Sequence, residues 1–150
     1  PPEPTAPTPS KHPPTRPIPM SHLLDTNIIS ELIRPSPDPG VQAEVAGLAQ
    51  IIISVITVEE IRFGLARKPN QRIQQWMDDF LAHQIILPIT PEIAEYAGTL
   101  RGQLAQQGIV RTQADMLIAA TARMNQLILM TRNVKDFSDC GVDIRNPFSA

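Results

Sequence analysis

The sequence is poor in cysteine, in aromatic residues and in excess charge of either sign. A single cysteine, Cys140, excludes an internal disulfide and a cysteine-based zinc cluster, and fits a reduced, cytoplasmic setting. The formal net charge of −2 provides no overall positive field for nucleic acid. A nucleic-acid partner would therefore need a local basic patch, a metal ion or both. No apolar run approaches the roughly 20 residues of a membrane helix, so we expect no membrane partner.

Proline, by contrast, is abundant and unevenly spread. Nine of the 16 prolines lie in residues 1–19, PPEPTAPTPSKHPPTRPIP, which contain almost nothing that can pack. We expect an extended or disordered tail there, either a passive or artefactual extension or, alternatively, a proline-motif ligand. Met20 is a plausible natural start because an apolar run follows within three residues. Residues 20–150 are then expected to form one domain.

Short apolar runs alternate with segments of helical periodicity along this domain. The runs predict strands at Ser21–Leu24, Gln50–Ser54, Ile85–Ile89, Leu127–Thr131 and Val142–Ile144. Apolar residues recur at helical spacing around Trp76 and Tyr96, and Gln113–Asn125 is apolar on nearly every side. Alternating strands and helices predict an α/β fold, a three-layer α/β/α sandwich around a parallel sheet of about five strands.

Acidic and amide side chains follow several of these strands. Asp25 follows the first strand, Glu59 and Glu60 come shortly after the second, and Asn133 and Asp136 follow the fourth. Asp115 lies in the first turn of the helix that leads into the fourth strand. Sites in open parallel sheets form beyond the carboxyl ends of the strands, so these side chains are expected to meet at one edge.

Each acid also has a simpler explanation. Asp25 can cap a helix that begins near Ile28, and Thr57 with Glu60 has the spacing of a capping box. Asp136 can be a solvated loop residue. Asp115 is harder to explain in this way, because it is the only charge in the apolar stretch QADMLIAATA, where an unpaired buried carboxylate is costly.

Several carboxylates in one partly buried cleft would repel one another and raise each other's pKa. A divalent cation resolves that conflict, and all-oxygen ligands favour Mg²⁺, with Mn²⁺ as an alternative, over Zn²⁺. Such a site activates water for attack on a phosphodiester. The sequence has neither G-x-x-x-x-G-K-[ST] nor G-x-G-x-x-G, so nucleotide-cradling loops are absent.

Four segments, LLDTNIISEL, SVITVEEIRFG, ADMLIAATA and LMTRNVKDF, in this order and spacing resemble the PIN-domain ribonucleases. The closest likeness is to VapC-type toxins of bacterial toxin–antitoxin systems, and it covers residues 20–150. The resemblance implies an endoribonuclease that hydrolyses RNA through a metal-activated water and leaves 5′-phosphate and 3′-hydroxyl ends. It also implies a homodimer and a cognate antitoxin partner.

The family's acidic residues are matched position by position. Asp25 and Asp115 would bind the metal directly, and Glu60, rather than Glu59, would assist directly or through water. Some members have an acid directly after the Thr-Arg pair, where this chain has Asn133, so either Asn133 or Asp136 completes the pocket. The expected supporting residues are Thr26, Asn27 and Thr131, for which turn and cap roles are the alternative.

Four basic residues lie near the acidic motifs and are candidates for RNA phosphate contacts: Arg62, Arg111, Arg132 and Lys135. The alternative for each is a solvated surface charge, or for Arg62 a helix-face partner of Glu59 or Glu60. The large apolar residues around Trp76 and Tyr96 suggest a surface for the second copy or the antitoxin, although core packing explains them more simply. Two other functions stay open: a non-catalytic PIN-like binding module and a DNA-directed metal nuclease.

Overall fold

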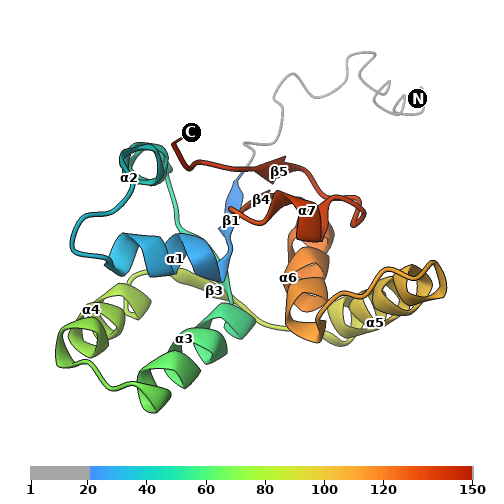
Figure 1. The fold of residues 1–150 in the computed structure, drawn as a ribbon, viewed down its shortest axis with the longest axis horizontal. Coiled ribbons are helices and arrows are strands. Elements are labelled where there is room, and N and C mark those ends of the chain that lie inside the picture. The colour runs from blue at the N-terminus through green and yellow to red at the C-terminus, as the bar shows by residue number, and fades with distance from the viewer. Residues whose placement is uncertain (1–20, 150) are drawn as a thin grey trace, which may run out of the picture.

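The computed structural model describes residues 21–149, so the predictions for the proline-rich segment 1–19 and for a start at Met20 lie outside the described residues. Strands and helices alternate along the described chain (Figure 1). The elements are β1 (His22–Leu24), α1 (Thr26–Ile33), α2 (Pro39–Ala46), β2 (Ile52–Ser54), α3 (Val55–Arg67), α4 (Gln71–Leu81), β3 (Ile85–Leu87), α5 (Pro91–Gln106), α6 (Gln113–Met124), β4 (Ile128–Met130), α7 (Val134–Phe137) and β5 (Ile144–Arg145).

The strands form one five-stranded sheet in the order β3-β2-β1-β4-β5, and every pairing is parallel. The predicted parallel sheet is therefore confirmed. The chain runs from β1 outward to β3 and then returns to the other side of β1 to form β4. The direction of winding reverses between β1 and β4, which is where open α/β sheets form their binding sites.

Successive residues of β1, β2 and β4 pack into two separate cores. Leu23, Ile52 and Leu129 pack with α5 and α6, whereas the next residues, Leu24, Ile53 and Met130, pack with helices α1 to α4. This alternation follows from the two-residue period of a strand. Figure 1 shows the same arrangement, with α1 to α4 on one side of the sheet and α5 and α6 on the other. The predicted three-layer sandwich is confirmed.

The observed strands are shorter than the apolar runs that predict them. Ile89, Leu127 and Val142 lie outside the strands, yet they pack partly buried against the core. Burial therefore continues beyond the hydrogen-bonded ladder, and hydrophobicity alone overestimates strand length.

Helix α3 corrects one alternative considered for Glu60. Its cap is Ser54, whose side chain accepts a hydrogen bond from the Ile56 backbone N–H, and Thr57 lies inside the helix. The capping-box interpretation of Thr57 and Glu60 is therefore wrong. Strand β2 runs directly into α3, so the last strand residue also serves as the cap.

The two helices with large aromatic residues mostly use them for packing within the chain. Trp76 and Tyr96 are each half-buried against one of the two cores, and Trp76 stacks on Phe80 with ring centroids 4.8 Å apart. The large apolar side chains that remain exposed include Phe63 and Val110. Among residues 21–149, no helix has the length and hydrophobicity needed to span a membrane.

Candidate active site

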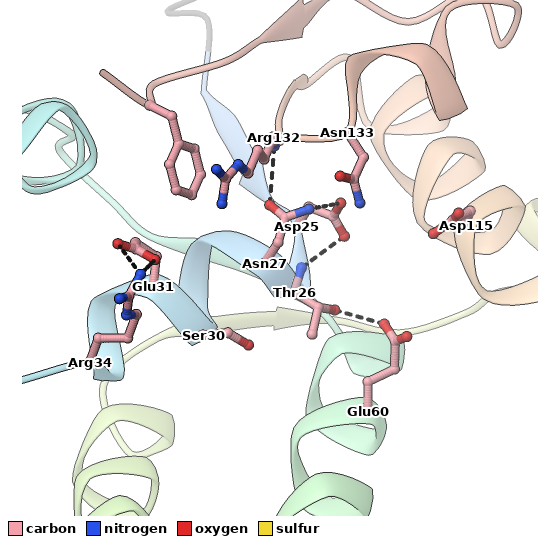
Figure 2. Close-up of a pocket in the computed structure, with 11 residues that line it drawn as sticks. Asp25, Thr26, Asn27, Ser30, Glu31, Arg34, Glu60, Asp115, Arg132 and Asn133 are labelled. Carbon is pink, nitrogen blue, oxygen red and sulfur yellow. Dashed lines mark hydrogen bonds and ion pairs between the residues drawn. The ribbon is translucent and has the colours of Figure 1, made fainter. Parts of the chain in front are cut away.

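A pocket of about 440 Å³ opens at the carboxyl edge of the sheet, where β1 and β4 end. Three of the predicted acids line it, although they come from separate segments of the chain (Figure 2). The lining residues are Asp25, Thr26, Asn27, Ser30, Glu31, Arg34, Glu60, Asp115, Arg132, Asn133 and Phe148. The predicted meeting of Asp25, Glu60 and Asp115 is thus observed.

Asp25 is the most rigidly held of the three acids. It is 4% exposed, and its Oδ1 accepts a hydrogen bond from the Thr26 backbone N–H at 2.8 Å. Its Oδ2 accepts from the Thr131 hydroxyl at 2.8 Å and from the Asn27 amide at 3.1 Å. Asp25 also caps α1, so its proposed cap role and its position in the pocket are both correct.

Glu60 and Asp115 reach the pocket from two helices that pack on opposite faces of the sheet. Glu60 is half-buried on α3 and accepts a hydrogen bond from the Thr26 hydroxyl at 2.7 Å, whereas Glu59 is exposed. Asp115 lies in the first turn of α6, where the Thr112 hydroxyl accepts a hydrogen bond from the Asp115 backbone N–H. Glu60, not Glu59, is therefore the acid in the pocket, as predicted.

Burial and mutual repulsion raise the proton affinity of these acids. Burial raises the pKa of Asp25 to about 6; the charges of Asp115 and Glu60 add to this effect, and hydrogen bonds from Thr131 and Thr26 oppose it. Burial also raises the pKa of Asp115, with the charges of Asp136 and Glu60 adding to it, while Thr112 and Arg111 oppose it. The charged forms of these carboxylates are therefore unfavourable unless a positive charge lies beside them.

The chemistry of these donors suits a hard divalent cation. All three contribute carboxylate oxygens, and Asp25 Oδ1, which accepts a single hydrogen bond, keeps a lone pair for a cation. As the side chains stand, no three His, Cys, Asp or Glu residues within 21–149 are grouped closely enough to form a metal site. Glu60 is turned toward Thr26, so binding would require the Glu60 and Asp115 side chains to rotate toward Asp25.

The predicted supporting residues form a hydrogen-bond network around Asp25. Thr131 is fully buried and, besides donating to Asp25, accepts from the Asn27 amide and from the Asn133 backbone N–H. The hydroxyls of Thr26 and Thr57 are also hydrogen-bonded to each other at 3.1 Å. These contacts join the ends of β1 and β4 and fix the orientation of the Asp25 carboxylate.

Asn133, rather than Asp136, lines the pocket. Asp136 lies in the first turn of α7, so it is not the loop residue considered as an alternative. It is still close enough for its charge to raise the pKa of Asp115. The amide therefore occupies the pocket wall, and Asp136 acts on the site through its charge.

The four basic residues considered for RNA contacts differ in their distance from the pocket and in their ion-pair partners. Arg62 pairs with Asp78 of α4 at 2.8 Å, so neither Glu59 nor Glu60 is its partner, and Arg111 pairs with Asp139 at 3.3 Å. Lys135 is exposed on α7, and neither it nor these two arginines lines the pocket. Of the four candidates, only Arg132 lines the pocket.

Sequence patterns missed the far end of the pocket, formed by Ser30, Glu31, Arg34 and Phe148. Glu31 is buried and accepts hydrogen bonds from the Arg34 guanidinium and from the Asp38 backbone N–H. A charge at a buried position of the amphipathic helix α1 was the signal available for Glu31. No comparable signal marks Phe148, which follows the last short strand.

The comparisons with known proteins agree with this geometry. Residues 22–141 match the PIN domain family model. The chain is 33% identical over 135 residues to "VapC ribonuclease Y4jK" of Sinorhizobium fredii, covering 84% of this chain and 96% of that protein. It is also 33% identical over 135 residues to "Toxin FitB" of Neisseria gonorrhoeae, covering 84% of this chain and 97% of that protein.

A solved structure gives the same result at the level of the fold. The crystal structure of VapBC2 from Rickettsia felis, bound to a DNA fragment from their promoter, matches with a TM-score of 0.76 and 30% identity. The match covers 85% of this chain and 98% of that one. The chain belongs to the PIN-domain family and, within it, to the VapC group.

Proposed function

We propose that the chain is a Mg²⁺-dependent endoribonuclease, with Mn²⁺ as an alternative ion, and the toxin of a toxin–antitoxin pair. The observation that carries the proposal is the convergence of Asp25, Glu60 and Asp115 in one pocket of about 440 Å³. The relatives named ribonucleases support RNA as the substrate. The structures that contain a toxin together with its antitoxin support a protein partner.

Asp25 and Asp115 would hold the cation, with Glu60 assisting. A cation held there would supply the positive charge that balances these carboxylates and the scissile phosphate, and would lower the pKa of a water for attack. Asp25 would serve as the fixed ligand, because three hydrogen bonds hold its carboxylate in place. Glu60, held by one hydroxyl, has the freedom to turn toward the phosphate and accept a proton from the attacking water. The products are expected to carry 5′-phosphate and 3′-hydroxyl ends.

The partner part of the proposal predicts two assemblies: a homodimer and a complex with an antitoxin. Phe63, 60% exposed on α3, is one apolar side chain that a partner would cover. Light scattering of the purified chain should give twice the 16.5 kDa mass. Addition of the antitoxin should abolish cleavage, whereas a monomer that no partner protein inhibits would contradict this part.

Parallel digestion of RNA and DNA tests the substrate. Purified, partner-free protein is incubated with a pool of tRNA and ribosomal RNA, or with single-stranded DNA, in Mg²⁺, in Mn²⁺ and in chelator. We expect metal-dependent fragments from RNA only. Preferential cleavage of DNA would indicate a DNA-directed nuclease, and folded protein that cleaves neither would indicate a binding module.

A further inference from the structure

The pocket has two chemically different ends. The acids Asp25, Glu60 and Asp115 occupy one end. Arg132 and Phe148 lie at the other, beside the ion pair of Arg34 with Glu31. Figure 2 shows Arg34 and Arg132 on one side of Asp25 and Asp115 on the opposite side. A polyanion that places one phosphate at the acids can therefore extend past Arg132.

Arg132 is held in place but not neutralised. Its guanidinium carbon lies 4.6 Å from the centroid of the Phe148 ring, within the range of a cation–π contact. Within the described residues no carboxylate forms an ion pair with Arg132, in contrast to Arg62, Arg111 and Arg34. A guanidinium has five N–H donors in a planar fork, and none of those of Arg132 donates a hydrogen bond to another residue within 21–149.

The C-terminal segment Asn146–Ser149 holds Phe148 in this position. The Asp38 carboxylate accepts hydrogen bonds from both the backbone N–H and the hydroxyl of Ser149, each at 3.0 Å. Gly40 allows this approach, because a Cβ there would lie 2.5 Å from the Pro147 carbonyl oxygen. The segment is thus fastened to the start of α2, and Phe148 is half-buried against the core of that face.

Arg132 is also connected to the acidic end. Its backbone N–H donates to the Asn27 side-chain oxygen at 3.1 Å, and the Asn27 amide donates to Asp25 at 3.1 Å. The position of the Arg132 backbone relative to the Asp25 carboxylate is therefore fixed by one side chain. With the backbone fixed by Asn27 and the guanidinium by the Phe148 ring, Arg132 can contact one phosphate while the acids contact the next.

We propose that Arg132, oriented by Phe148, binds the RNA phosphate adjacent to the scissile one. This inference rests on the proposed ribonuclease function and adds a substrate subsite to it. Arg132 contacts the substrate, and Phe148 is a positioning residue that acts through Arg132. Because the contact is to a phosphate, it contributes affinity and register but no base preference.

The test compares Arg132→Gln with a control, Arg123→Gln. Arg123 is an exposed arginine in the last turn of α6, at the opposite end of that helix from Asp115, and it does not line the pocket. Steady-state cleavage of a short single-stranded RNA gives kcat and KM. The salt dependence comes from binding of the same RNA over a series of salt concentrations. For this measurement wild type and each variant also carry Asp115→Asn, so that the RNA is bound but not cleaved. Thermal unfolding of each variant checks that it folds.

We expect Arg132→Gln to raise KM about tenfold, as the loss of one charge-assisted hydrogen bond implies, with little change in kcat. The plot of the logarithm of the RNA association constant against the logarithm of salt concentration should become less steep by about 0.7, the value for one phosphate contact on a single strand. Phe148→Leu should raise KM but change the salt slope less than Arg132→Gln does, because the charge of Arg132 remains. Phe148→Tyr, which keeps an aromatic ring, should have the wild-type KM. Arg123→Gln should match wild type in KM, kcat and salt dependence.

Wild-type KM and salt slope in folded Arg132→Gln would overturn the subsite and leave the ribonuclease proposal intact. A change of base preference with an unchanged slope would also overturn it, because that result indicates a base contact. If the wild-type protein cleaves no RNA, the function and the subsite fall together.

Discussion

Asp25 combines burial with the need to be charged. Its side chain is almost inaccessible, and burial raises its pKa to about 6, so the metal-free protein holds a carboxylate whose charge its surroundings disfavour. The hydrogen bonds from Thr26, Asn27 and Thr131 reduce this penalty but do not remove it. A residue of this kind lowers stability at neutral pH and prepares a site for a cation.

This interpretation predicts that Asp25→Asn changes how stability depends on pH. Folding raises the pKa of Asp25 from 3.8 to about 6, so the folded state binds the proton more tightly. The resulting stabilisation is present below pH 3.8 and is lost as pH rises through 6. Between pH 4 and pH 7.5 the variant should gain up to about 3 kcal/mol relative to wild type. Urea unfolding in chelator measures this, and a constant difference between the two proteins would contradict it.

Thr131→Val tests the network that holds Asp25. The substitution keeps the shape of a fully buried side chain but removes the hydroxyl that donates to Asp25 Oδ2. Because that hydrogen bond favours the charged carboxylate, its loss should raise the pKa of Asp25 further. NMR titration of the Asp25 carboxyl carbon measures the shift. In the control Thr121→Val, the lost hydroxyl contacts only the Leu117 carbonyl, and the titration should not change.

At the scale of the elements, the start of α2 and the C-terminal segment form one structural unit. Asp38 caps α2 and also binds Ser149, so one carboxylate serves a helix and a distant segment. The sequence contains only two buried apolar residues in α2, Val41 and Val45, which is why helical periodicity did not reveal this helix. Its position on α1 nevertheless determines where Phe148 lies.

Gly40→Ala should disrupt this unit. The added Cβ would approach the Pro147 carbonyl oxygen to 2.5 Å, and a backbone atom cannot move away as easily as a flexible side chain. We expect a loss of roughly 1–3 kcal/mol in the free energy of unfolding. The control Gly102→Ala lies in α5 with open space around it and should gain about 0.5–1 kcal/mol. Equal effects in urea unfolding would contradict the predicted contact.

At the scale of the whole molecule, sheet order explains which parts of the site were predictable. Asp25, Glu60 and Asp115 could be brought together from sequence because strand ends in a parallel sheet share one edge. The choice of Asn133 over Asp136 depends on the first turn of α7, and the position of Phe148 depends on hydrogen bonds between residues 38 and 149. Local periodicity contains no information about such distant contacts. The wrong cap at Thr57 arose from local sequence instead. Thr57 and Glu60 have the spacing of a capping box, but the helix is capped three residues earlier, at Ser54.

The most direct test of the active-site assignment is metal-dependent RNA cleavage by wild type and Asp115→Asn. The matched control is Asp79→Asn, an exposed acid on α4 that does not line the pocket. We expect cleavage by wild type and Asp79→Asn in Mg²⁺ or Mn²⁺, none in chelator, and a loss of at least 100-fold, on the order of one catalytic group, in Asp115→Asn. Retained cleavage by folded Asp115→Asn, or cleavage in chelator, would contradict the assignment.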